Sequence, residues 1–168
     1  KKTIISAAVG ASLATTAAGV IAKEEGVSKD KKTGQVAAYW DPPGQKKLVS
    51  IGYGHQIKDH EYKQGFINAG GEQIFIRGDQ GIDTVMTKDQ ARGLLAIDLK
   101  KYEKRAAAPL GGKFEHLSDE EKVALISYAY NTGSTGSLVK AGLLTAINND
   151  DPISGGAIIA DRGIQTAG

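Results

Sequence analysis

The sequence contains no cysteine, so disulfide bonds, a thiol nucleophile and thiolate metal ligands are excluded. This absence assigns no compartment, because proteins outside the cytosol are permitted disulfides and do not require them. An excess of one charge is also missing, since 21 Lys and Arg stand against 19 Asp and Glu. The net charge of +2 implies no large basic field, and we expect no nucleic-acid partner. It would still favour an anionic polymer such as a cell wall.

The remaining composition is that of a globular protein, with 40% hydrophobic and 24% charged residues in a chain of 168. This length is enough for one domain, or for one domain with two lobes, around a substantial core. We expect neither a cofactor nor a metal.

The N-terminal residues 3–22 carry no charge. Twenty uncharged residues can span a bilayer, but most of these are Ala, Gly, Ser and Thr, which gain little from leaving water. Three interpretations stand side by side. The segment is a cleavable secretion signal, a weak membrane anchor that can leave the bilayer, or a helix packed on its own domain or on a partner.

Residues 35–57 read as a β-hairpin, in which "PPGQ" is the turn between "QVAAYWD" and "KLVSIGYG". Residues 58–85 are Gly-rich and irregular, with "EQIFIRG" as a further strand. The pattern then becomes helical, with further helices predicted at about 137–148 and 152–161. This order predicts an α+β protein of two lobes.

Two capping boxes mark the starts of the main helices. Thr87 with Gln90 opens a helix that ends before Pro109, and Ser118 with Glu121 opens a helix that ends at Gly133.

Two acids flank the predicted hairpin. Glu25 lies at the end of the N-terminal helix, and Asp41 lies at the hairpin turn. Glycoside hydrolysis needs such a pair, one carboxyl as a proton donor and one as a carboxylate. The hydroxyl of Ser50 on the returning strand could hold a water against Asp41. Acids beside turns also serve as caps or solvated charges, and spacing alone does not separate these roles.

Several ordered motifs carry a resemblance to a family. They are Glu25-Gly26, Tyr39-Trp40-Asp41, "SIGYGH" at 50–55, "MTKDQARGLLAIDL" at 86–99 and "ALISYAYNTGSTG" at 124–136. The chain resembles the phage-type lysozymes, glycoside hydrolase family 24, over most of residues 21–148. The resemblance implies a two-lobed, lysozyme-like α+β fold and a monomer.

The resemblance also implies domain boundaries. Residues 23–168 would form the lysozyme domain, with a small catalytic β lobe at 23–86 and a mainly helical lobe at 87–168 that begins with a long connecting helix. Residues 1–22 would be a signal-anchor-like or packed helix.

The activity that the resemblance implies is that of a muramidase, which hydrolyses the glycosidic bond after N-acetylmuramic acid in peptidoglycan. Glu25 is then the general acid, and Asp41 positions water and stabilises the oxocarbenium-like transition state. Glu24 is the rival acid, but the family's Glu directly precedes Gly. Ser50 stands where the family usually has Thr.

Other site residues follow from the same resemblance. His55 pairs with Asp98 in a structural ion pair, and Tyr53, Tyr130 and Asn131 contact the saccharide. For the last two, a core ring and a helix C-cap are the alternative interpretation.

The sequence departs from the family pattern in four places. The segment between Glu25 and Asp41 is longer than in the family, and so is the hairpin. Residues 59–83 form an expanded loop. Relatives continue with a Gly-Gly step and a basic helix, and the Trp expected near Ile164 is missing. Either the C-terminal end is truncated or the last helix is supplied in another way.

Some phage lysozymes carry an Ala- and Gly-rich signal-anchor-release segment, which residues 3–22 resemble. This favours export to the periplasm with transient inner-membrane association, ahead of a cleaved signal and of a virion-tail lysozyme. A lytic transglycosylase would not need Asp41 or Ser50. A catalytically weak wall-binding or structural module would not retain both acids.

Overall fold

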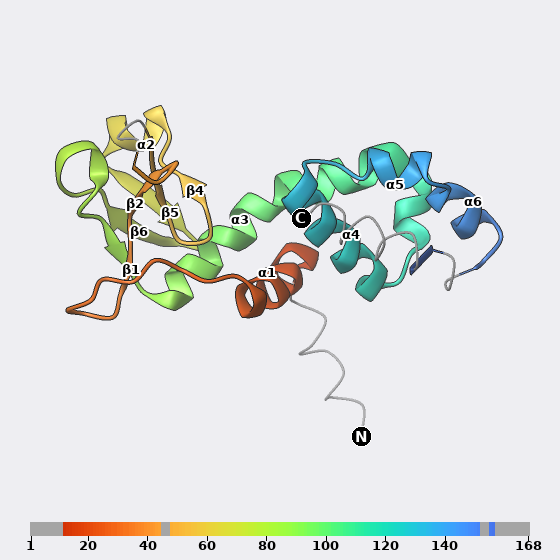
Figure 1. Ribbon diagram of the computed structural model, residues 1–168, viewed down its shortest axis with the longest axis horizontal. Helices are drawn as coiled ribbons and strands as arrows, with labels where there is room; N and C mark the ends of the chain where they lie inside the picture. The colour runs from red at the N-terminus through yellow and green to blue at the C-terminus, as the bar shows by residue number, and fades with distance from the viewer. Residues whose placement is uncertain (1–11, 45–47, 152–154, 157–168) are drawn as a thin grey trace, which may run out of the picture. The chain divides into compact units, whose positions relative to one another are not determined.

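The structure is a computed structural model that describes residues 12–44, 48–151 and 155–156. Its internal contacts divide the chain into two compact units. Residues 18–98 form the first unit, called the β unit here, and the described residues before 18 and after 98 form the second, the helical unit. Helices and antiparallel sheets are both present, which confirms the predicted α+β class. Figure 1 shows the order of these elements along the chain.

Three small antiparallel sheets build the β unit. One pairs β1 (Val36–Ala37) with β7 (Val85–Met86), and another orders β2 (Tyr39–Asp41), β3 (Leu48–Ile51) and β4 (His55–Gln56) side by side. The third pairs β5 (Phe66–Ala69) with β6 (Glu72–Phe75). The predicted hairpin is present in register, with Trp40 opposite Val49.

The core of the β unit is aliphatic, as the β-branched residues of its strands predict. Its buried members come from all three sheets and from the first turns of the long helix α3: Val36, Val49, Ile51, Ile57, Ile67, Ala69, Ile74, Met86, Ala91 and Leu94. Strands and helix start therefore form one packed body.

The expanded segment is more regular than its sequence suggests. It contains helix α2 (Asp59–Gln64), the β5–β6 hairpin and the 3-10 turn η1 (Asp79–Gly81). The hairpin turn is Gly70-Gly71, and both residues have positive φ (64° and 101°), the conformation of a two-residue turn between antiparallel strands. The strand predicted at "EQIFIRG" is confirmed as β6, but the prediction that the rest of the segment is irregular was wrong, because the partner strand "FINA" gives little local signal.

Helix α1 (Leu13–Glu24) places its small residues inward. Ala14, Ala17, Ala18 and Ile21 are buried at the spacing of one helical face, whereas Thr15, Thr16 and Gly19 are exposed. Among the described residues, no helix has both the length and the apolar character needed to cross a bilayer. The first part of the segment at 3–22 lies outside the described residues.

Helix α3 (Lys88–Ala107) begins at the predicted capping box, because Thr87 and Gln90 exchange hydrogen bonds of 2.9 and 3.1 Å. It is followed by the 3-10 segment η2 (Ala108–His116) and by α4 (Asp119–Thr132), whose capping box is also present. The two sequence signals at the helix starts are thus confirmed.

The predicted helix at 137–148 is two helices. α5 (Gly136–Lys140) and α6 (Leu143–Asn148) are separated at Gly142, whose φ of 106° ends a helical path. The helix expected at 152–161 lies almost entirely outside the described residues. The core of the helical unit is formed by Leu99, Ala106, Leu110, Phe114, Leu125, Ile126, Ala129, Leu138 and Leu143.

Candidate active site

Asp41 and Ser50 meet across the β2–β3 hairpin. Ser50 lies opposite Tyr39, and Asp41 is two residues further along β2, so all three side chains share one face of the sheet. The hydroxyl Oγ of Ser50 donates a hydrogen bond to Oδ2 of Asp41 at 3.1 Å. The predicted neighbours are therefore in direct contact.

The burial of the two residues differs. Ser50 is fully buried, and a buried hydroxyl needs a hydrogen-bond partner, which here is the carboxylate. Asp41 is only half-buried, and its second oxygen Oδ1 forms no hydrogen bond with the described residues. One oxygen of Asp41 is thus held in place while the other stays available to a water or a substrate.

Glu25 follows the last residue of α1. Its backbone N–H donates to the carbonyl of Ile21 at 2.8 Å, and its side chain is exposed. Burial raises the pKa of Tyr39, and the negative charges of Asp41 and Glu25 raise it further. The charges of both predicted catalytic acids therefore raise the pKa of the same residue, Tyr39.

The turn from β3 to β4 is made by two glycines in the left-handed region, Gly52 (φ 66°) and Gly54 (φ 86°). A Cβ on Gly52 would lie 3.6 Å from the side chain of Ala91, so the turn passes close to α3. Between the glycines, Tyr53 is half-buried and packs against the core of the β unit, as does Trp40. The predicted contact of Tyr53 with a saccharide would use the exposed part of its ring.

His55 lies between two carboxylates. Its Nδ1 is 2.7 Å from Oδ2 of Asp98, the partner that the resemblance implied, and its Nε2 is 3.0 Å from Oε2 of Glu61. The ring is buried, with 5% exposed. Burial lowers the pKa of His55, but the hydrogen bonds to Asp98 and Glu61 outweigh it and raise this pKa to about 9. The imidazolium therefore stabilises the β unit through its two ion pairs, and its structural role stays a prediction.

Glu61 is the residue that the sequence reasoning missed. Burial would raise its pKa, but the hydrogen bonds from His55 and from the backbone N–H of Lys58 lower it. The available signal was its place three residues after Lys58, where a capping box has its acid. Lys58 is an unusual N-cap residue, so the sequence alone does not indicate a capping box at Lys58 and Glu61.

Tyr130 and Asn131 belong to the helical unit, in the last turn of α4. The ring of Tyr130 packs edge-on to that of Tyr102, with 5.4 Å between centroids. Asn131 is exposed, and Gly133 rather than Asn131 occupies the C-cap. Tyr130 and Asn131 therefore belong to a different unit from Asp41 and Ser50. Their contact with a saccharide stays a prediction.

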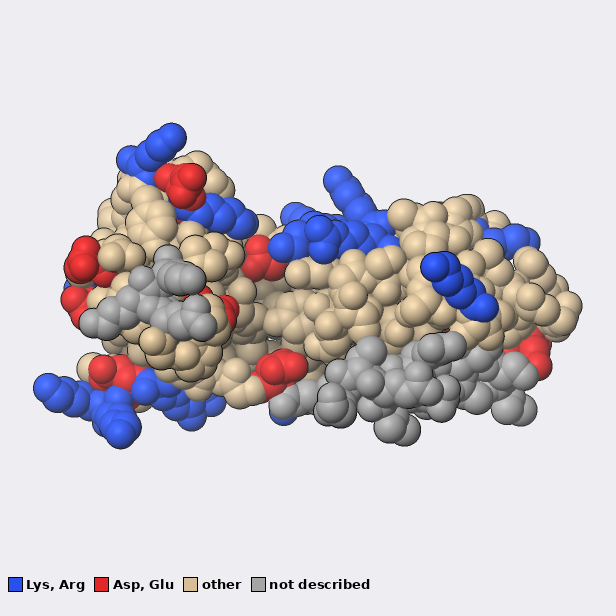
Figure 2. All heavy atoms as spheres, turned by 45° about the horizontal axis from the view of Figure 1, so that its top comes forward, with Lys and Arg blue, Asp and Glu red and all other residues tan. Residues whose placement is uncertain are grey.

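A group of cations also lies on the helical unit. Lys100, Lys101, Lys104 and Arg105 of α3 are exposed, and none of them forms an ion pair with a described residue. Figure 2 shows Lys and Arg side chains gathered over this stretch. Lys101 and Arg105 lie over the ring of Tyr102, at 4.8 and 5.4 Å from its centroid. In the described ranges, no three His, Asp or Glu side chains are grouped to hold a metal ion.

Comparison with known proteins connects this geometry to a family. The family model described as phage lysozyme matches residues 29–158, a range that contains Asp41, Ser50, His55 and Asp98. Glu25 lies just before the matched range. Neither the curated proteins nor the solved structures contain a match to the chain. Because the family match covers well over half of the 168 residues, the chain belongs to the phage lysozyme family.

Proposed function

We propose that this protein is a muramidase that hydrolyses the β-1,4 bond between N-acetylmuramic acid and N-acetylglucosamine in peptidoglycan. Family membership supports a peptidoglycan-degrading glycosidase. The observation that carries the finer proposal is the hydrogen bond between Ser50 and Asp41. The charges of Asp41 and Glu25 both raise the pKa of Tyr39, which supports the pairing of the two acids.

The chemistry assigns one role to each acid. Glu25, protonated, donates its proton to the glycosidic oxygen as the bond from this oxygen to the anomeric carbon breaks. Asp41, ionised, stabilises the positive charge that develops on the sugar and accepts a proton from the attacking water. The products are a new reducing end on one chain and a free hydroxyl on the other, and proton exchange with solvent then returns Glu25 to its acid form and Asp41 to its ionised form.

Ser50 positions the base in this scheme. Its hydrogen bond to Oδ2 restrains the carboxylate, so that Oδ1 keeps one direction toward the water. A hydroxyl is enough for this purpose, which is why Ser replaces the family's usual Thr without loss of the contact. The methyl group of Thr would restrict the χ1 rotamer further.

Two other functions are distinguished by their products. A lytic transglycosylase breaks the same bond with one acid and no water, and it leaves a 1,6-anhydro end. A wall-binding or structural module leaves the bond intact. The retention of Asp41 with its hydroxyl partner Ser50 favours hydrolysis over both.

The site of action that we propose is the bacterial periplasm, for lysis of the host wall. Residues 3–22 would hold the protein at the inner membrane for a time and then leave it. Support comes from the lack of charge in this segment and from the buried small-residue face of α1, which suits a released helix. A virion-tail location is the alternative.

The test is turbidity loss of purified peptidoglycan, with product ends identified by mass spectrometry. We expect reducing ends from the wild type and a loss of at least about a hundredfold in rate for Glu25→Gln, because the amide cannot donate the proton. Glu24→Gln is the matched control and should stay active. Full activity of a folded Glu25→Gln variant would contradict the assignment.

A further inference from the structure

The β5–β6 hairpin presents aromatic and amide side chains away from the core. Phe66 lies opposite Phe75, and Asn68 lies opposite Gln73. Residues that oppose one another, or that lie two apart along a strand, share a face, so these four form one face, called the amide–aromatic face here. The buried residues of the hairpin occupy the other face: Ile67, Ala69 and Ile74.

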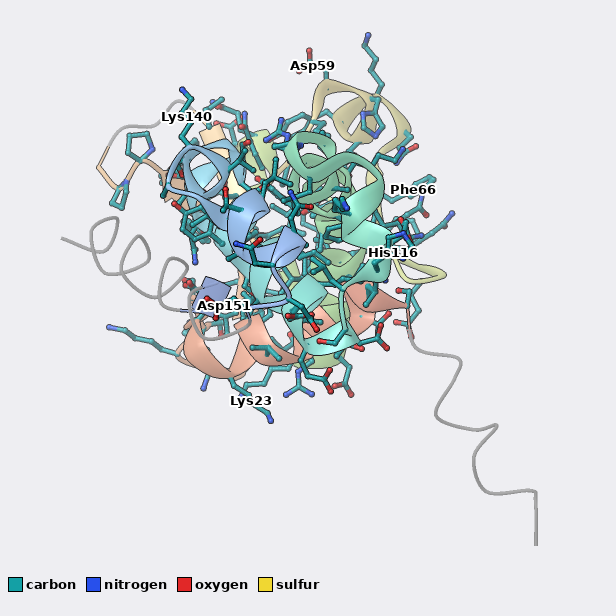
Figure 3. All side chains as sticks on the ribbon, turned by 90° about the vertical axis from the view of Figure 1, so that its right-hand side faces the viewer. Lys23, Asp59, Phe66, His116, Lys140 and Asp151 are labelled. Atoms are coloured by element: carbon teal, nitrogen blue, oxygen red, sulfur yellow. The ribbon has the colours of Figure 1, made fainter. Side chains whose placement is uncertain are left out.

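The exposure of this face is unusual. Phe75 is 60% exposed, more than any other large hydrophobic side chain in the described part of the chain. Figure 3 labels Phe66, the first residue of strand β5 in the same hairpin. The side-chain amides of Asn68 and Gln73 are exposed and form no hydrogen bond with described residues. Phe75 and the half-buried Phe66 therefore present apolar surface beside two amides that are available to a ligand.

A hollow of about 280 Å³ adjoins the face. Its lining includes three alternate residues from β6 and the segment after it, Gln73, Phe75 and Arg77. Gln35, just before β1, and Gln90 of α3 also line it. Arg77 is exposed, and its guanidinium has no carboxylate partner among the described residues. The volume lies at the lower end of ligand sites, which suits one unit of a chain.

The hairpin is held firmly on α3. A Cβ on Gly93 would lie 3.6 Å from the backbone of Ala69, so strand and helix pack closely. The amide of Gln90 donates to Oε2 of Glu72 at 2.6 Å, which adds a hydrogen bond between the hairpin and α3. A face that is already rigid loses little entropy when it binds a ligand.

We infer that the amide–aromatic face is a second glycan-binding site, separate from Asp41 and Ser50. This inference rests on the proposed function. Flat sugar faces pack on aromatic rings, while amides both donate to and accept from hydroxyl and acetamido groups. The free charge of Arg77 complements a carboxylate on the peptides that substitute the glycan. The occupant is thus a chain of N-acetylated amino sugars that carries acidic peptides.

A second site would change how the enzyme works on its polymer. Once one site holds a strand, the second binding step occurs at a raised effective concentration. The protein would then remain on the wall between cleavage events. Short soluble oligosaccharides would not benefit, because they do not span two sites.

The experiment uses the full chain with Glu25→Gln, so that the ligand is not cleaved, and titrates it with an N-acetylglucosamine hexamer while amide resonances are recorded. We expect shifts in two groups, at residues 39–55 and at 66–77. Phe75→Ala should abolish the second group and leave the first. Ile97→Ala, which removes an apolar side chain that is 40% exposed on α3, is the matched control.

A second measurement uses insoluble peptidoglycan. Phe75→Ala should weaken sedimentation with the polymer by roughly fivefold to tenfold, as expected for an aromatic anchor. In the active enzyme, which retains Glu25, the same substitution should leave the hydrolysis of short oligosaccharides unchanged. Gln73→Ala should weaken it less. Shifts at 39–55 alone, or unchanged sedimentation of Phe75→Ala, would overturn the inference. A dimer that Phe75→Ala dissociates would also overturn it, because a second copy would then cover the face. Shifts at 66–77 alone would support the glycan site and contradict the proposed function.

Discussion

Ser50 donates a hydrogen bond to Oδ2 of Asp41 at 3.1 Å across the β2–β3 hairpin, which leaves Oδ1 of Asp41 without a partner among the described residues. The bond joins a fully buried hydroxyl to a half-buried acid. If this arrangement positions a water, the two residues should differ in their effect on rate.

Asp41→Asn should lose most peptidoglycan hydrolysis, because the amide neither accepts the proton of water nor stabilises a cation as a carboxylate does. Ser50→Ala should lose less, roughly tenfold, because it only frees the carboxylate to rotate. Ser50→Thr should be tolerated. Initial rates with purified sacculi check all three variants, and an Asp41→Asn enzyme as fast as the wild type would refute the two-acid scheme.

The ion pairs of His55 predict a stability that depends on pH. The folded pKa of His55 is raised to about 9, above its unfolded value of about 6.5. Stabilisation is therefore complete below pH 6.5, on the order of 3 kcal/mol, and is lost as pH rises through about 9. Urea unfolding between pH 6 and pH 10 measures this loss.

The His55→Gln variant supplies the comparison. It should be less stable at pH 7 by about 3 kcal/mol, because it leaves the carboxylates of Asp98 and Glu61 without their cation, and the difference from wild type should shrink toward pH 10. A constant difference over this range would show that the imidazole contributes by packing alone. The lowered pKa of Glu61 adds stability that is lost as pH falls through its folded value.

The capping box at α4 predicts a simple stability effect. Ser118 accepts from the backbone N–H of Glu121 at 3.2 Å, and the Glu121 carboxylate accepts from the N–H of Ser118 at 2.8 Å. Ser118→Ala should lower the free energy of unfolding by about 1 kcal/mol. Ser118→Asp is the control and should retain most of the stability. Equal unfolding of wild type and Ser118→Ala would contradict the role of the cap.

The cations on α3 predict a salt-dependent attachment to anionic walls. Lys100, Lys101, Lys104 and Arg105 have no ion-pair partners among the described residues, so they remain available to phosphate or carboxylate groups. Replacing the three lysines with Gln should weaken sedimentation with peptidoglycan at low salt and flatten its salt dependence. The exposed Lys31 and Lys63, replaced in the same way, serve as controls. An unchanged salt dependence would show that these cations are only solvated.

The proposed release from the membrane predicts that the protein moves from the membrane fraction to the soluble fraction. Collapse of the membrane potential should move the intact protein from the membrane to the soluble fraction and start lysis, because the segment at 3–22 is only marginally apolar. Leucines at Thr15, Thr16 and Gly19 should retain it in the membrane. These positions are exposed in α1, whereas Ala14 and Ala18 are buried, and leucine there would also disturb packing. A protein soluble throughout would contradict the anchor.

The sequence alone determined the features that depend on neighbours along the chain. The capping boxes at Thr87 and Ser118, the hairpin around the "PPGQ" turn, and the α+β class follow from spacing within a few residues. That Asp41 and Ser50 lie on the two strands of one hairpin follows in the same way, whereas their hydrogen bond depends on the register that the structure shows.

The tertiary structure alone decided what depends on distant contacts. Glu61 reaches His55 because α2 places it there, and the capping-box spacing from Lys58 marks a helix start without indicating His55 as the partner. The β5–β6 hairpin forms where the sequence looked irregular, since its inward residues Ile67 and Ile74 are stabilised by the core of the β unit. The same packing leaves Phe75 exposed on the opposite face. Burial is a property of the whole fold, and local propensity does not contain it.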